Sequence, residues 1–195
     1  LIIAFVTQFG FGLLIGIFPL YSEAVLFPGI DHKTISFAVG LLLAVFGVGQ
    51  LITQVILLPK MLQHYSDPMI VVIGVLCRTI GMFVFAIALA PLMGSVAAIF
   101  SAVGGGLLMP PLTSLITKTV IPEFRGAILG VYQSATNLAV IFSTALSGVL
   151  FAIDPTIPFW VGGVLSFVSL FPALFLWNWS HTHQKVKNED LVMQP

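Results

Sequence analysis

A run from Gly126 to Ile153 contains no charged side chain. An α-helix rises about 1.5 Å per residue, so about 20 apolar residues cross the hydrocarbon core of a bilayer, and this run exceeds that length. It is not a plain apolar anchor, because polar side chains recur along it: Gln133, Ser134, Thr136, Asn137, Ser143, Thr144 and Ser147. Polar groups in a membrane-spanning helix need surroundings other than lipid, which constrains the fold strongly.

The residues of this helix divide into two rows. Helical spacing predicts one face that carries amides and hydroxyls: Gln133, Asn137, Thr144 and Ser147. A second row consists of small residues, which let another helix approach closely: Gly126, Gly130 and Ser134. We therefore expect the helix to pack through the small row and to turn its amide face toward a polar environment.

The composition is that of a membrane protein. Hydrophobic residues make up 58% of the 195 residues and charged residues only 7%, against about 25% charged in soluble domains. Seven basic and seven acidic side chains cancel, so no strong field attracts nucleic acid. We expect a polytopic protein in contact with the lipid bilayer and with no nucleic-acid partner. The single cysteine, Cys77, excludes a disulfide within one chain.

Six apolar segments are predicted to cross the membrane. They cover residues 1–26, 35–58, 69–90, 95–117, 126–153 and 159–179. Prolines bracket a loop at 59–68, and Pro91 with Gly94 predicts a tight turn. Residues 1–180 are then one bundle and 181–195 a polar tail. The chain starts inside an apolar segment, without a signal peptide or charged flank, so we expect an upstream part to be missing.

Basic residues in the connectors favour one side of the membrane. Those on the shared side are Lys60, Lys118, Arg125, Lys185 and Lys187, against Lys33 alone on the other. Cytoplasmic loops carry the excess of Lys and Arg, so we expect the C-terminus in the cytoplasm and the protein in the plasma (inner) membrane. This orientation predicts an aromatic belt at each membrane surface. Trp177 and Trp179 belong to the cytoplasmic belt, and Tyr21 and Trp160 belong to the outer one.

The junction before the fifth segment resembles a family motif, P-E-x-R-G-x-x-x-G. The matching residues are Pro122, Glu123, Arg125, Gly126 and Gly130, followed by Ser134 and the pair Leu138-Ala139. With six segments that start in the cytoplasm, this resembles the C-terminal half of a major facilitator superfamily transporter. Residues 104–116 and 18–21 resemble its drug-efflux branch. The resemblance implies that an N-terminal six-helix half is missing and that this chain supplies helices seven to twelve.

The resemblance also implies a gating region at the cytoplasmic side. The 59–68 loop lies where the family often carries a Gly- and Arg-rich signature, of which only the charges of Lys60 and Asp67 remain. Glu123, Arg125, Gly126 and Gly130 form the second part of this region. Glu123 has two interpretations: a carboxylate at the positive end of a helix dipole, or a latch that breaks when the two halves rock.

The fourth segment carries three consecutive glycines (104–106) and then Pro110 and Pro111. The glycines lack the lysine that follows a phosphate-binding loop, so we expect them to permit close helix packing. Each proline removes a backbone donor and crowds the carbonyl four residues earlier, which predicts a helix bend. A moving gate and a static kink remain equal alternatives for that bend.

Six residues are the candidate solute-binding set: Gln8, Phe11, Gln50, Gln54, Gln133 and Asn137. Amides buried in hydrocarbon are costly without partners, so they are expected to face other helices or a wet path. Hydrogen bonds between helices are the alternative explanation. The resemblance favours the path interpretation, because helices seven, eight, ten and eleven line the central solute path in transporters of this family. Phe5 and Phe9 could extend the aromatic wall around Phe11.

Arg78 is the one charge inside a segment that lies far from both ends, which makes it a functional candidate. The resemblance instead places it on helix nine, peripheral to the path, where a bond to a carbonyl or to helix eight would be structural. No acidic residue lies at its depth, so a proton-titrating carboxylate is not expected in this half.

These patterns predict an all-α membrane protein, six transmembrane helices that form one half of a twelve-helix major facilitator fold. We expect a transporter of a small organic solute, with proton-coupled efflux as the first hypothesis. A sugar or metabolite porter of the same fold, or a non-transporting scaffold or receptor, remain alternatives. No enzyme, cofactor or metal site is expected, because the histidines lie in loops or the tail without metal-ligand spacing.

Overall fold

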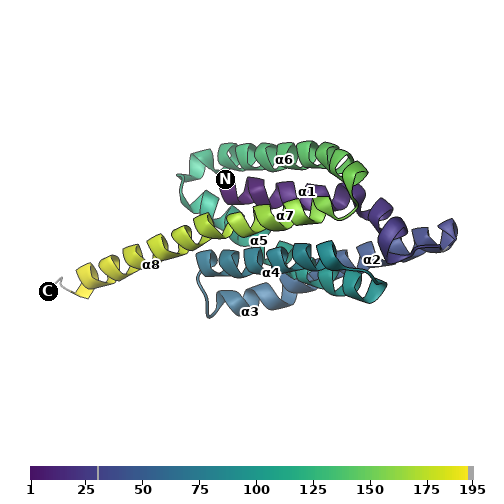
Figure 1. The fold of residues 1–195 in the computed structure, drawn as a ribbon. Helices are drawn as coiled ribbons and strands as arrows, with labels where there is room; N and C mark the ends of the chain where they lie inside the picture. The colour runs from purple at the N-terminus through teal and green to yellow at the C-terminus, as the bar shows by residue number, and fades with distance from the viewer. Residues whose placement is uncertain (30, 193–195) are drawn as a thin grey trace.

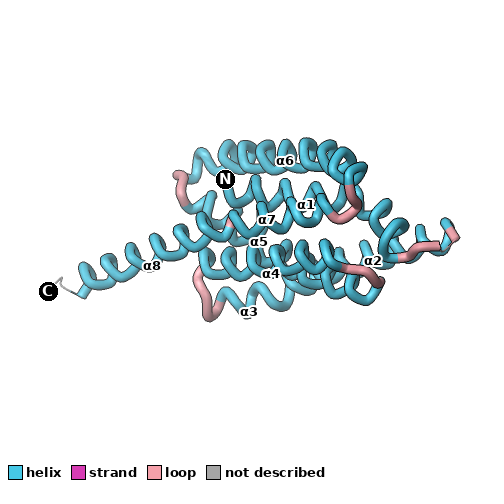
Figure 2. Tube along the Cα trace, in the orientation of Figure 1, coloured by secondary structure: helices cyan, strands magenta, loops and turns pink. Residues whose placement is uncertain are grey.

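The computed structural model describes residues 1–29 and 31–192, and its elements in this range are helices joined by short loops (Figures 1 and 2). Two π-helical turns, η1 and η2, and one 3-10 turn, η3, adjoin the α-helices. In chain order the elements are α1 (Ile2–Tyr21), η1 (Ser22–Leu26), α2 (His32–Ile52), η2 (Thr53–Leu57), α3 (Leu58–Leu62), α4 (Asp67–Ile87), α5 (Pro91–Lys118), η3 (Pro122–Phe124), α6 (Arg125–Ile153), α7 (Ile157–Val168) and α8 (Leu170–Val192).

Six stretches of the described chain are long and apolar enough to cross a bilayer: Ile2–Leu26, Lys33–Leu62, Asp67–Ile87, Pro91–Lys118, Pro122–Ile153 and Ile157–Ser180. The six predicted spans and the all-α fold are thereby confirmed. The N-terminus lies at the end of the bundle from which α8 projects toward the C-terminus (Figure 1). An even number of crossings places the two ends of the chain on the same side.

Two predicted boundaries were wrong, both at prolines. The second span continues through Pro59 to Leu62, because the π-helical turn η2 ends at Leu57 and leaves Pro59 in the first turn of α3. A proline is tolerated there, since the N–H it lacks would have no partner within the helix. The predicted loop 59–68 therefore shrinks to residues 63–66. Pro91 likewise opens α5, so Gly94 is not in a turn but in a buried helical position against Leu26.

The sixth span is divided at Ser169, where α7 ends and α8 begins. Pro172 stands in the first turn of α8, which is where a proline is tolerated. Beyond the span, α8 continues to Val192, so the predicted tail starts as a helical extension. Nearly all side chains after Ser180 lie outside the described part of the chain, including those of His181 and His183.

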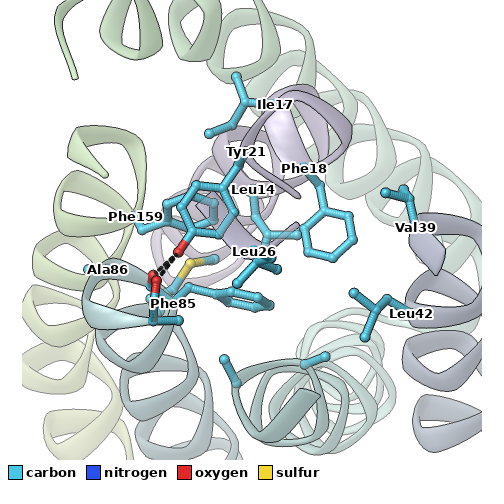
Figure 3. Packing of buried hydrophobic residues seen from close by; sticks show 14 of the residues in the cluster. Leu14, Ile17, Phe18, Tyr21, Leu26, Val39, Leu42, Phe85, Ala86 and Phe159 are labelled. Carbon is cyan, nitrogen blue, oxygen red and sulfur yellow. Dashed lines mark hydrogen bonds between the residues drawn. The ribbon is translucent and has the colours of Figure 1, made fainter. Parts of the chain in front are cut away.

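An aromatic cluster closes the end of the bundle opposite the chain termini (Figures 1 and 3). Tyr21 and Phe159 lie with ring centroids 4.4 Å apart, and Phe85 stacks on Phe159 at 5.4 Å. The Tyr21 side chain is fully buried, and its hydroxyl donates to the carbonyl oxygens of Phe85 and Ala88. The prediction of Tyr21 in a lipid-facing belt was wrong, because this hydroxyl satisfies carbonyls at the end of α4 that lack helical partners.

Glycines set the closest helix contacts. A Cβ at Gly12 of α1 would lie 1.9 Å from the Ser143 hydroxyl oxygen of α6, and one at Gly16 would lie 2.3 Å from that of Ser147. The predicted packing row on α6, Gly126, Gly130 and Ser134, is instead exposed, and no described residue lies within 4 Å of a Cβ at either glycine. The helix packs through serines because the matching glycines stand on α1, which the pattern of α6 alone does not reveal.

Candidate functional site

Arg78 lies in the middle of the bundle, about 16 Å along α4 from Asp67. Its side chain is only 2% exposed. The guanidinium carbon lies 4.7 Å from the ring centroid of Phe11 on α1, a cation–π contact. Phe11 in turn stacks on Phe46 of α2, with centroids 5.8 Å apart and ring planes 20° apart. Three helices thus meet around one buried charge.

The glycine triplet of α5 makes room for this charge. Gly104 packs on α4, where a Cβ would lie 2.7 Å from the Arg78 backbone nitrogen, and Gly106 packs on η2, where a Cβ would lie 2.8 Å from the Thr53 side chain. Gly105 stands between them: a Cβ there would lie 3.3 Å from Nη1 of Arg78 and 3.7 Å from the side-chain amide of Gln50. The predicted close packing at 104–106 is confirmed, and its middle residue faces a guanidinium and an amide.

The electrostatics of Arg78 are unusual. Its Nε and Nη2 atoms are buried and have no hydrogen-bond partner among the described residues. The Phe11 ring stabilises the charge but accepts no conventional hydrogen bond from these atoms. The Arg78 charge thus lies against Phe11, one of the candidate solute residues, and the peripheral placement implied by the resemblance stays a prediction.

The amides of α6 lie on an exposed surface of the described chain. Gln133 donates a hydrogen bond of 3.0 Å from Nε2 to Oδ1 of Asn137, and both residues are exposed. Further along the predicted polar face, Thr144 donates at 3.4 Å to the Gly12 carbonyl and Ser147 is buried against Gly16. The face is therefore split, with its first half open and its second half packed on α1.

The remaining candidates lie on α1 and in η2. Gln8 and Gln54 are half-buried and make no hydrogen bond to other described residues. Phe5 and Phe9 line a small hollow next to Leu165 of α7. The part of Phe5 and Phe9 in the aromatic wall stays a prediction, whereas Phe11 is joined by Phe46, which the sequence reasoning missed because phenylalanine is common in such spans.

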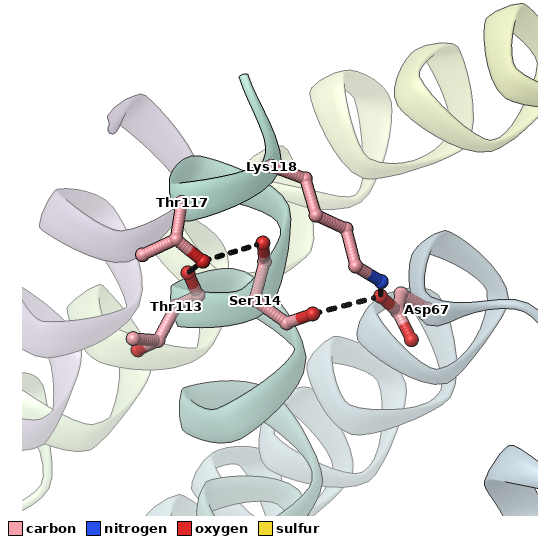
Figure 4. Close-up of polar contacts among 5 residues, drawn as sticks. All are labelled: Asp67, Thr113, Ser114, Thr117 and Lys118. Carbon is pink, nitrogen blue, oxygen red and sulfur yellow. Dashed lines mark hydrogen bonds and ion pairs between the residues drawn. The ribbon is translucent and has the colours of Figure 1, made fainter. Parts of the chain in front are cut away.

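An ion pair joins α4 and α5 at the end of the bundle near the termini (Figure 4). Asp67 Oδ2 accepts from Lys118 Nζ at 2.6 Å and from Ser114 Oγ at 3.1 Å. Asp67 was a predicted gating residue, whereas its partners were missed. Ser114 and Lys118 stand one helical turn apart at the end of α5, and this spacing was the sequence signal that could have indicated a shared partner. Lys60, Glu123 and Arg125 are exposed at the same end.

The helix α5 continues through Pro110 and Pro111 without interruption, so the bend predicted there stays a prediction. A hollow of 490 Å³ lies near this end of the bundle, between α1, α5, α6 and α8. Its lining is mainly aliphatic and includes Ile3, Leu112, Ile116, Ile128 and Leu176. None of the candidate solute residues lines it, so its position does not mark the predicted site.

The model of the Major Facilitator Superfamily matches residues 1–193. The chain belongs to the major facilitator superfamily. The predicted resemblance is thus confirmed, and the six helices are those of a superfamily half.

Relatives within the superfamily are named for drug resistance. The multidrug resistance protein MdtH of Photorhabdus laumondii is 33% identical over 112 residues, which cover 57% of this chain and 28% of that protein. The quinolone resistance protein NorA of Staphylococcus aureus is 22% identical over 175 residues, which cover 88% of this chain and 42% of that protein. The chain therefore spans less than half the length of these relatives. As a superfamily member it is an integral membrane protein of a transporter family, and such transporters are generally not enzymes.

Proposed function

We propose that this chain is one half of a transporter that exports a small organic solute by alternating access. Residues 1–180 form its six-helix bundle and 181–195 its cytoplasmic tail, in the plasma membrane. The open amide pair of α6 carries the proposal. Gln133 lies about 16 Å along the span from Pro122, near mid-membrane, and together with Asn137 it presents amides on an exposed surface. Lipid cannot satisfy such groups, so this surface is expected to face a wet path or another protein segment.

A second six-helix half is the proposed partner. In α2 with its extension, 17% of the apolar span is buried, and in the α6 span 22%, against 61% in α4. The two open spans carry Gln50, Gln54, Gln133 and Asn137, so a partner half that faces them would enclose a polar path. The greater length of the relatives supports such a half.

The chemistry of the candidate residues favours an amphipathic organic solute. Amide groups of Gln8, Gln50 and Gln54 both donate and accept hydrogen bonds, and Phe11 offers an aromatic surface next to them. Drug efflux is the favoured direction, because the relatives are named for resistance. Within the described spans, acidic residues stand only near the ends, as Glu23 and Asp67 do. The proton-coupling carboxylate is therefore proposed to lie in the partner half.

The test uses the complete gene product reconstituted in proteoliposomes. A quinolone antibiotic is the solute, and an imposed proton gradient is the driving force. We expect gradient-dependent movement of the quinolone that disappears when the gradient is collapsed. Gradient-driven movement of sugars without quinolone movement would favour the porter alternative. No movement of any tested solute by correctly folded protein would favour the scaffold.

A further inference from the structure

We propose that Arg78 is a carboxylate-binding group of the solute site, so that the transporter selects organic solutes that carry a carboxylate. The inference rests on the proposed function and names its substrate class. The site is the Arg78 guanidinium, and Gly105 stands near both its Nη1 atom and the Gln50 amide. The stack of Phe11 on Phe46 covers this site in the present conformation.

The two unpartnered atoms of Arg78 specify the ligand chemistry. Nε and Nη2 form one edge of the planar guanidinium, and their N–H groups point in parallel directions. This edge binds a carboxylate through two parallel hydrogen bonds, the geometry in which arginine and carboxylate match best. Among the described residues no acceptor meets this edge, although it is buried. A binding edge is thus present and lacks its partner.

The charge favours an anion over a neutral acceptor. An unpaired cation in the membrane interior is costly, and a cation–π contact offsets only part of that cost. No described acidic residue lies near the middle of a span, so the described bundle does not neutralise Arg78. A carboxylate cancels one positive charge, whereas a doubly charged phosphate would leave an excess negative charge in a region of low dielectric.

Access to Arg78 is controlled by one aromatic layer. Phe11 and Phe46 are half-buried and stack between α1 and α2, two helices that otherwise contact each other little. Phe11 is thus covered less completely than the guanidinium behind it. A rotation of the Phe11 side chain uncovers the guanidinium without separating the tightly packed α4 and α5.

Binding is tested on the purified full-length protein with two small aromatic probes, benzoate and benzamide. They have the same ring and nearly the same size, but only benzoate carries a charge. The readout is the increase in the thermal unfolding midpoint as each probe is titrated, because a ligand that binds the folded state raises it. We expect benzoate to stabilise the wild-type protein at lower concentrations than benzamide. Equal stabilisation by the two probes would overturn the proposal.

Three variants assign the effect to one residue. Arg78→Gln should weaken benzoate binding about ten- to hundredfold and leave benzamide binding unchanged, since a hydrogen-bonded charge is lost. Arg78→Lys keeps the charge without the planar edge and should give an intermediate loss. Lys33→Gln is the control that removes a positive charge elsewhere, because Lys33 is exposed at the start of α2, and it should bind benzoate as the wild type does.

A structural role for Arg78 gives a different pattern. If Arg78 only supports the fold, Arg78→Gln lowers the unfolding midpoint of the ligand-free protein and leaves the benzoate affinity of the folded fraction unchanged. That result overturns the proposal, and unchanged benzoate binding in Arg78→Lys does the same if the glutamine variant does not fold. Because this assay needs no transport, intact benzoate selection without transport would contradict only the proposed function.

Discussion

The hydroxyl of Tyr21 donates a hydrogen bond of 2.6 Å to the carbonyl oxygen of Phe85, which joins the exit of the first span to the end of α4 (Figure 3). The same hydroxyl reaches the Ala88 carbonyl at 3.0 Å. One side chain therefore satisfies two carbonyls at a helix terminus, inside an aromatic cluster that excludes water. This contact ties the end of the first span to the end of α4 and holds Tyr21 inside the protein rather than against lipid.

Replacing Tyr21 tests how much these two hydrogen bonds stabilise the bundle. Tyr21→Phe keeps the ring and leaves the two carbonyls unsatisfied, so it should lower the free energy of unfolding by about 1–3 kcal/mol. The measurement is thermal or denaturant unfolding of the full-length protein in detergent. Tyr65→Phe is the control, because Tyr65 is exposed in the 63–66 loop, and it should have no effect. Equal stability of the two variants would contradict the role assigned to Tyr21.

The contact of α1 with α6 depends on glycine. In Gly12→Ala the new methyl group would meet Ser143 at 1.9 Å and the Val140 backbone at 3.0 Å, so the helices must separate. We expect a loss of about 1–3 kcal/mol in stability, as for other overpacked interiors. Gly148→Ala adds the same methyl group on α6 where no described residue lies within 4 Å, and it should be neutral or slightly stabilising. A neutral Gly12→Ala would show that this contact is not tight.

The Asp67–Lys118 pair calls for a double-mutant cycle. Asp67→Asn, Lys118→Gln and the double variant should give a coupling energy of about 0.2–1 kcal/mol, because the Lys118 side chain is 66% exposed and water screens the pair. The coupling should shrink as salt is raised. If the pair acts in gating, the transport rate of each variant changes more than its stability does. If the two substitutions have additive effects on both the stability and the transport rate, the Asp67–Lys118 pair does not act in gating.

Replacing Asn137 distinguishes a role in solute binding from a role in helix packing. In the described chain its side chain bonds to Gln133 on the same helix, so Asn137→Ala should leave stability nearly unchanged. Solute affinity should fall by about 0.5–1.5 kcal/mol, the net value of one neutral hydrogen bond. Both quantities are measured in the full-length transporter, by ligand titration and by unfolding. A loss of stability without a loss of affinity would assign Asn137 to contact with the partner half instead.

The orientation is tested with single cysteines in a Cys77→Ser background. His64→Cys and Thr34→Cys place exposed thiols at opposite ends of the second span, one in the 63–66 loop and one at the start of α2. The Lys and Arg distribution predicts His64 inside and Thr34 outside. An impermeant thiol reagent added to intact cells should label position 34 and reach position 64 only after the membrane is opened. Labelling of both positions in intact cells would contradict the predicted topology.

The fold class followed from local pattern. Six long apolar segments with few charges leave helices across a membrane as the structure that satisfies every backbone group within its own segment. The P-E-x-R-G-x-x-x-G motif indicated the family for a similarly local reason, since its residues belong to one helix start. The errors at Pro59 and Pro91 arose because a proline at a helix start and a proline in a loop have the same sequence neighbours.

The candidate site depended on contacts between segments far apart in the sequence. Spacing placed Arg78 far from both ends of its span but could not show that it meets Phe11, because depth along a helix says nothing about rotation around it. The same limit made Gly126 and Gly130 look like the packing row, although Gly12 and Gly16 receive the serines of α6. Helical periodicity defines a face, and only the assembled bundle decides what that face meets. Arg78 shows this most clearly: its charge was visible in the sequence, while its burial and its unpartnered edge result from four helices packing around it.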